Sequence, residues 1–143
     1  MNAIRVLVVA TMLGLAGQVS AKEVLHLVEH ADTDAVVDTG AKDDSAGDLL
    51  TFANPVFDQD NKTQVATDQG YCVRTVAGAA WECSWTMSLK GGQITVQGPF
   101  LDKGDSVLAI TGGTGTYSKA SGQMKLHARN EKGSEYDFIY EIE

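Results

Sequence analysis

Residues 93–126 read QITVQGPFLDKGDSVLAITGGTGTYSKASGQMKL, and this stretch decides the fold. It contains three short runs of apolar and β-favouring residues, separated by glycines and polar residues. The glycines recur too often for an amphipathic helix. Apolar residues instead fall at alternating positions, as Ile94, Val96 and Phe100 do, which is typical of a strand with one buried face. We therefore predict a β-meander with glycine-rich turns.

The same alternation extends over the rest of the chain. The further strands are expected at Val24–His30, Leu49–Phe57, Thr63–Thr67, Tyr71–Val76, Ala80–Leu89 and Ser134–Ile142. Residues 31–46 are predicted to form a polar loop, and Asp68-Gln69-Gly70 a turn. Eight or nine short strands without a convincing helix fit an antiparallel barrel or a sandwich. We favour an all-β, calycin-like barrel of eight antiparallel strands, because closure removes exposed sheet edges.

The first 21 residues have the pattern of a secretory signal peptide. A short cationic start is followed by the apolar residues 6–15 and by Val19-Ser20-Ala21, which resembles a cleavage site. An apolar run of this length is too short to span a bilayer. We therefore expect a single barrel domain over residues 22–143, secreted or periplasmic, with no membrane span.

The net charge bears on the possible partners, and the cysteine content bears on a disulfide. Eleven basic residues stand against 19 acidic ones, for a net charge of −8, which disfavours binding to nucleic acid. Two cysteines in an exported chain favour a disulfide. A two-residue turn at Ala77-Gly78 would place Val76 opposite Ala79 and Cys72 opposite Cys83, so we predict that bridge. A longer turn over residues 77–80 would break this register and leave two thiols.

The meander resembles that of the plant allene oxide cyclases. The likeness rests on ITVQGPFL at 94–101, LAITGGTG at 108–115 and GQMKL at 122–126, with weaker matches at residues 47–54 and 70–72. Dirigent proteins share a similar TGGxG element. The resemblance implies an eight-stranded barrel, a homotrimer, and ring closure of an unstable fatty-acid epoxide that needs no metal or organic cofactor.

The resemblance also implies a site. The cavity walls would be Leu50, Phe52, Cys72, Trp81 and Phe100. Asn54 matches a cavity asparagine of the family, whereas Phe100 stands where the family has a tyrosine. The family glutamate of the first strand aligns with Leu27, and Glu29, two residues on, lies on the same strand face and is the candidate replacement. Glu29 would stabilise positive charge as an epoxide opens, and Asn54 would hold the oxygen.

Three hypotheses for the function follow. The first is a cofactor-free cyclase or isomerase of a reactive lipid-like or polyketide-like molecule. The second is a small-molecule binding protein, or a dirigent-like guide without chemistry of its own. The third is a structural or inhibitory secreted barrel with a packed interior. No metal site is expected, since the histidines have no evident convergent partners. No cofactor is expected either, because the resemblance implies a reaction that needs none.

Overall fold

The computed structural model describes residues 22–143, so the expected signal peptide lies outside the described residues. The elements are β1 (Glu23–His30), β2 (Ala35–Val37), β3 (Leu49–Asp58), β4 (Gln64–Val76), β5 (Ala80–Leu89), β6 (Gly92–Leu101), β7 (Ser106–Gly113), the 3₁₀ turn η1 (Gly115–Tyr117), β8 (Gly122–Ala128) and β9 (Glu135–Ile142). Nearly every predicted strand is present, with ends that differ by a few residues.

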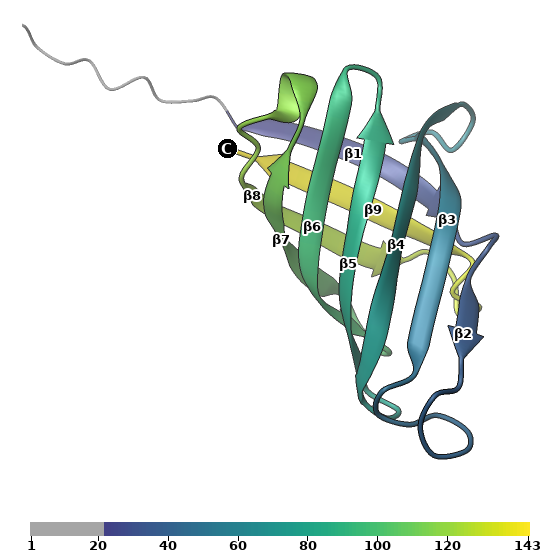
Figure 1. Cartoon of the computed structure of the whole chain (residues 1–143). Coiled ribbons are helices and arrows are strands. Elements are labelled where there is room, and N and C mark those ends of the chain that lie inside the picture. Colours follow the sequence, from purple (N-terminus) through teal and green to yellow (C-terminus); the bar gives the residue numbers. More distant parts are fainter. Residues whose placement is uncertain (1–21) are drawn as a thin grey trace, which may run out of the picture.

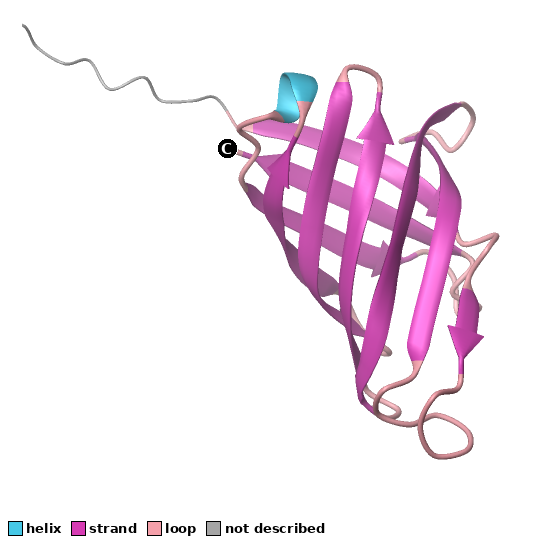
Figure 2. Cartoon of the chain, in the orientation of Figure 1, coloured by secondary structure: helices cyan, strands magenta, loops and turns pink. Residues whose placement is uncertain are grey.

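These strands close into an antiparallel barrel (Figures 1 and 2). Neighbouring strands follow the order β1-β9-β8-β7-β6-β5-β4-β3-β2, and an additional pairing of β1 with β3 closes the ring. Eight strands, β1 and β3–β9, therefore form the wall, and the short β2 lies outside this ring beside the start of β3. The predicted eight-stranded all-β barrel is confirmed. Among residues 22–143, no helix is long and apolar enough to cross a membrane.

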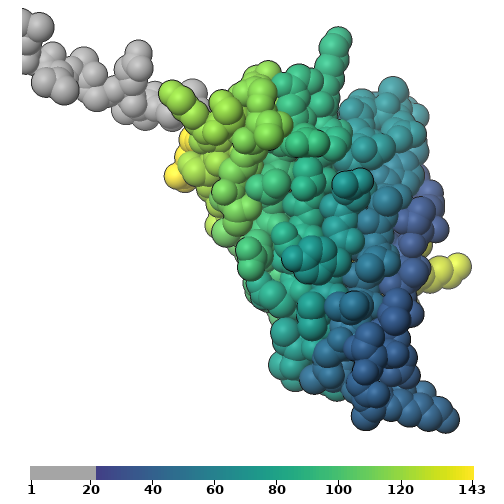
Figure 3. Space-filling view, viewed as in Figure 1, coloured from purple at the N-terminus to yellow at the C-terminus, as the bar shows by residue number. Residues whose placement is uncertain are grey.

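The barrel core follows from the alternation of side chains. Every second residue of β5 and the start of β6 points inward and is buried, and the facing strands contribute matching apolar positions. The fully buried side chains include Met87, Ile94, Val96, Leu108, Met124 and Tyr140. Figure 3 shows the outside of the same wall, whose exposed apolar side chains include Tyr71, Val76, Leu101 and Val107.

One predicted turn is wrong. Asp68-Gln69-Gly70 lies inside β4, which runs without a break from Gln64 to Val76. Gly70 is needed for packing, because a Cβ at this position would collide with the Ser84 backbone and with Trp85 on β5. Asp68 consequently points into the barrel and is buried. The predicted loop at 31–46 likewise contains β2.

The predicted disulfide between Cys72 and Cys83 is confirmed, although the turn that joins their strands differs from the prediction. Val76 pairs with Ala80 rather than with Ala79, so the turn has three residues. A register shift between Arg74 and Val76 compensates for the extra residue and restores the pairing of the two cysteines. Because of this register shift, a β-bulge, the two cysteines face each other and form a disulfide although the turn is longer than predicted.

Arg74 joins three segments at one end of the barrel, which we call the lower end because it is drawn lowest in Figure 1. Its guanidinium donates to Asp44, in the β2–β3 loop, at 2.6 and 2.7 Å. It also donates to Asp102, in the β6–β7 loop, at 2.6 and 2.8 Å. The same group lies 4.5 Å from the ring centre of Trp81. Arg74 thus holds both loops against the β4–β5 hairpin.

Candidate functional site

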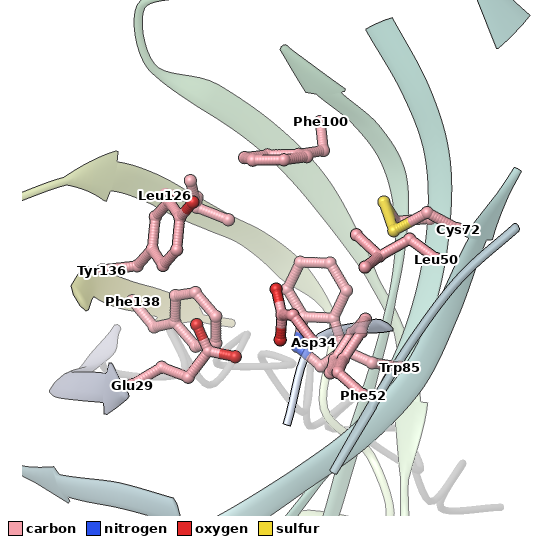
Figure 4. Close-up of a pocket in the computed structure, with 11 residues that line it drawn as sticks. Glu29, Asp34, Leu50, Phe52, Cys72, Trp85, Phe100, Leu126, Tyr136 and Phe138 are labelled. Atoms are coloured by element: carbon pink, nitrogen blue, oxygen red, sulfur yellow. A yellow bond between two sulfur atoms is a disulfide. The ribbon is translucent and has the colours of Figure 1, made fainter. Parts of the chain in front are cut away.

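A cavity of about 40 Å³ lies inside the barrel (Figure 4). Its walls are mainly aromatic and aliphatic, with two carboxyl groups and one phenol. The lining residues are Glu29, Asp34, Leu50, Phe52, Cys72, Cys83, Trp85, Phe100, Leu126, Tyr136 and Phe138. Figure 4 shows the carboxyl groups of Glu29 and Asp34 directed toward the space between the rings. The site is therefore an apolar pocket with a small acidic area.

The closure of the barrel brings Glu29 to Asn54. β1 pairs with the end of β3, and Glu29 faces Val56, two residues from Asn54. The Asn54 Nδ2 group donates to Glu29 Oε1 at 2.7 Å and to Asp34 Oδ1 at 2.8 Å. A single amide therefore holds both carboxyl groups of the cavity.

Thr33 determines which way the Asn54 amide points. Its backbone N–H donates to Asn54 Oδ1 at 2.9 Å, and its hydroxyl lies 2.9 Å from the same oxygen. The hydroxyl also accepts from the Ala53 backbone at 2.7 Å, which fixes the loop to β3. With the oxygen occupied in this way, the amide N–H groups are directed toward the acids. Asn54 is 1% exposed, so this orientation is enforced by burial as well.

A third acid, Asp68, lies on the other side of Asn54. β4 pairs Asp68 with Asn54, and the Asn54 backbone N–H donates to Asp68 Oδ1 at 3.3 Å. The other carboxyl oxygen, Asp68 Oδ2, is buried and has no hydrogen-bond partner within residues 22–143. Burial and the nearby charge of Glu29 raise the pKa of Asp68. This residue was not identified from the sequence, because it was assigned to a turn.

Burial also raises the pKa of Glu29, from 4.5 to about 7. The hydrogen bond from Asn54 opposes the rise, and the negative charge of Asp34 adds to it. Glu29 can therefore exchange a proton near neutral pH, as a general acid or base requires. The pKa of Tyr136 rises to about 12 because of burial and the charges of Glu29 and Asp34, so its phenol stays a hydrogen-bond donor.

The raised pKa of Glu29 predicts how stability depends on pH. Below pH 4.5 this carboxyl is protonated in both the folded and the unfolded chain, whereas between 4.5 and about 7 only the folded chain holds the proton. Stability is thus lost as the pH rises through this window. We expect wild-type protein to lose on the order of 2–3 kcal/mol relative to Glu29→Gln between its two ends. Urea unfolding of both proteins below pH 4.5 and above pH 7 measures the difference, and an equal response of both would contradict the assignment.

The structure places most of the expected site residues around one space. Leu50, Phe52, Cys72 and Phe100 line the cavity with Glu29, and Asn54 lies directly behind Glu29. Trp81 is not among the lining residues, because its ring lies under Arg74 at the lower end. Cys72 contributes a disulfide to the wall rather than a thiol.

Several lining residues were not identified from the sequence. They are Asp34, Cys83, Leu126, Tyr136 and Phe138. The alternation of Tyr136 and Phe138 was visible in the sequence, but it does not distinguish a cavity wall from a packed core. Tyr136 matters most, because its ring meets Phe100 edge-on at 5.9 Å and carries a hydroxyl where Phe100 has none. Among residues 22–143, no group of three or more potential metal ligands converges.

Solved structures share this barrel. Pyocyanin demethylase is 24% identical, with a TM-score of 0.72 over 83% of this chain and 99% of that one. A pterocarpan synthase dirigent protein is 15% identical, with a TM-score of 0.68 over 85% of this chain and 83% of that one. The Diels–Alderase from Streptomyces koyangensis is 13% identical, with a TM-score of 0.66 over 90% and 72% of the respective chains. At these identities the likeness concerns the fold.

The amino-acid sequence identifies the family, whereas these structures show only the fold. A family model described as allene oxide cyclase matches residues 17–130, which includes the meander, the hairpin with both cysteines, and the strands that hold Glu29 and Asn54. The match extends over most of the chain and over most of the candidate site. The protein therefore belongs to the allene oxide cyclase family.

Proposed function

We propose that this protein is a cofactor-free cyclase or isomerase that holds a small, reactive and largely apolar molecule in the barrel. The observation that carries the proposal is the Glu29 carboxyl, buried at the wall of an apolar cavity and bound by Asn54 at 2.7 Å. A carboxyl in such a place stabilises developing positive charge or moves a proton between two positions of one molecule. Both tasks suit an intramolecular rearrangement.

The remaining walls support the same reaction class. The rings of Phe52, Phe100 and Phe138 restrict the conformation of an apolar substrate, and such restriction is the main requirement for closing a ring. Their faces also stabilise a delocalised cation. The Tyr136 hydroxyl provides the donor that Phe100 lacks, so an oxygen of the substrate would bind there or near Asn54.

The size of the cavity limits the substrate. A volume of about 40 Å³ holds a few water molecules, whereas pockets for drug-sized ligands measure about 300–1,000 Å³. A substrate would therefore place only its reacting part between Glu29 and the rings, or displace side chains at the mouth. The half-buried Phe52, Phe100 and Tyr136 are the side chains with room to move. A lipid-like or polyketide-like molecule would extend beyond the mouth.

A second candidate is a dirigent-like guide or carrier without chemistry of its own. It is favoured by the composition of the cavity, because eight of the eleven lining residues are apolar or half-cystines. In this case the acids would serve only to orient a bound molecule.

The test is to offer the protein reactive epoxides and conjugated polyenes of different lengths. Native mass spectrometry reports binding, and chiral chromatography reports the product. Enantiomeric excess together with a higher rate supports the cyclase, and excess without a higher rate supports the guide. Racemic product at the uncatalysed rate, despite binding, would exclude the cyclase and the guide and leave a carrier.

We further propose that the protein is exported and forms a homotrimer. The disulfide suits an oxidising compartment. Exposed apolar side chains on the outer wall offer an interface: Tyr71 and Val76 on β4, Leu101 on β6 and Val107 on β7. Val73 on β4 and Ile139 on β9, two apolar residues that alternation places on the outer face, are half-buried and could extend this interface. Light scattering at micromolar concentration is expected to return three times the chain mass, and a monomer mass would contradict the trimer.

A further inference from the structure

Two buried carboxyl groups from different strands lie beside Asn54 and within hydrogen-bonding reach of each other. β3 lies between β1 and β4, so Glu29 comes from one neighbouring strand and Asp68 from the other. The Asn54 side chain donates to Glu29 at 2.7 Å, and its backbone donates to Asp68 at 3.3 Å. Glu29 is 5% exposed and Asp68 is 2% exposed. The two acids therefore occupy one small region that water barely reaches.

Asp68 is the more deeply buried and the less satisfied of the two. Its Oδ2 atom has no hydrogen-bond partner within residues 22–143. An ionised carboxylate with a free buried oxygen is unfavourable, because neither water nor a donor compensates its charge. Protonation removes the charge and converts Oδ2 into a donor. Glu29, which receives only one hydrogen bond from Asn54, offers the acceptor.

The surroundings favour a neutral acid at this position. The other charged groups that act on the pair are Asp32 and Asp34 from the β1–β2 loop, and both are acidic. β9 contributes Tyr136 and Tyr140, whose phenols remain protonated. From β5, Trp85 donates its indole N–H to Tyr140 at 3.4 Å and adds no charge. No cation acts on the pair from any of these elements, so two adjacent negative charges would stand uncompensated.

We propose that Asp68 is a positioning residue: it holds the proton that the pair retains once Glu29 has ionised, and it donates its O–H to Glu29. Glu29 then faces the cavity as a carboxylate with two fixed donors, Asn54 and Asp68. The role of Asp68 in turnover rests on the proposed function, whereas the sharing of the proton does not. In an isomerisation Glu29 accepts a proton from one atom of the substrate and returns it to another, and the Asp68 proton stays in place throughout. No oxidant or co-reactant is needed.

The first experiment detects the proton directly. At a pH between the values of about 7 for Glu29 and about 9 for Asp68, the infrared spectrum of the wild-type protein is expected to contain the carbonyl stretch of a protonated carboxylic acid. Asp68→Asn should remove this band. Asp60→Asn, which changes an exposed acid in the β3–β4 turn, should retain it. The proposal is overturned if the wild-type protein lacks the band or if Asp68→Asn keeps it at full intensity.

The second experiment asks whether Asp68 acts through Glu29. An asparagine at position 68 keeps an N–H donor, whereas a leucine of similar size has none. With carboxyl-labelled glutamate, the infrared midpoint for Glu29 should rise by about one pH unit or more in Asp68→Leu and change by less than about half a unit in Asp68→Asn. Equal midpoints in the two variants would show a merely structural residue. If Asp68→Leu does not fold, the first experiment still decides.

The two proposals can fail independently. If Asp68→Asn loses the band while the wild-type protein gives racemic product at the uncatalysed rate from every substrate offered, the shared proton stands and the cyclase proposal falls. If Glu29→Gln is inactive and the band survives in Asp68→Asn, the cyclase stands and the role of Asp68 falls.

Discussion

Glu29→Gln is expected to lower kcat/KM for any substrate that the protein cyclises or isomerises by about 10²- to 10⁴-fold, the usual contribution of a general acid or base. Glutamine has the same length and can still accept the hydrogen bond that Asn54 donates at 2.7 Å. The substitution therefore removes the charge and the exchangeable proton while it preserves the shape of the cavity. The product should return toward the racemic mixture that forms without enzyme. Chiral chromatography and initial rates measure both effects.

A matched control separates this effect from a general change in charge. Glu135, at the start of β9, is a partly exposed acid whose side chain does not line the cavity. Glu135→Gln removes the same charge and should leave kcat/KM within about twofold of wild type, because exposed charges are well screened. If Glu29→Gln retains the wild-type rate and the same enantiomeric excess, Glu29 has no chemical role. The rate would then have to come from the way the cavity walls restrict the substrate.

The fold could be predicted because it depends on local patterns that repeat. Alternation in β5 and β6 predicted the strands, and Gly91 and Gly104 lie in the turns that were expected beside them, whereas Gly112 and Gly113 lie inside β7. Gly70 misled the prediction because a glycine serves either a turn or a close approach, and the sequence does not say which. Only the position of Trp85 on the neighbouring strand shows that Gly70 makes room for a side chain. The distinction is a tertiary one.

The site was predicted in part for the same reason. Glu29 and Asn54 were named from a family resemblance, and their contact depends on the pairing of β1 with β3, which strand patterns alone do not give. Asp68 was missed because its segment was interpreted as a turn, and an acid in a turn is ordinarily solvated. Tyr136 lies in a segment that was predicted as a strand, but its contact with Phe100 joins β9 to β6, and strand patterns do not show which strands face each other inside the barrel.

Arg74→Met is expected to lower the free energy of unfolding by about 2 kcal/mol, because it removes charge-assisted hydrogen bonds to two carboxylates that water can still reach. Arg74 is 6% exposed and binds Asp44 and Asp102 through both arms of its guanidinium. Methionine retains the apolar contact with Trp81 and loses the charge, so the change reports the ionic contacts. Arg74→Lys should recover only part of the loss, since an ammonium cannot form two bidentate pairs. Urea unfolding at neutral pH measures all three proteins.

Arg129 provides the matched control for this arginine. It pairs with Asp137 at 3.0 Å, but its side chain is 33% exposed, so Arg129→Met should cost less than about 1 kcal/mol. Equal losses in the two variants would show that Arg74 acts as an ordinary surface arginine.

The consequence for the site can be checked in the same proteins. Arg74 lies two residues from Cys72, which lines the cavity, and its partner Asp102 follows Phe100 by two residues. Arg74→Met should therefore weaken ligand binding at temperatures at which the barrel is still folded, whereas Arg129→Met should not.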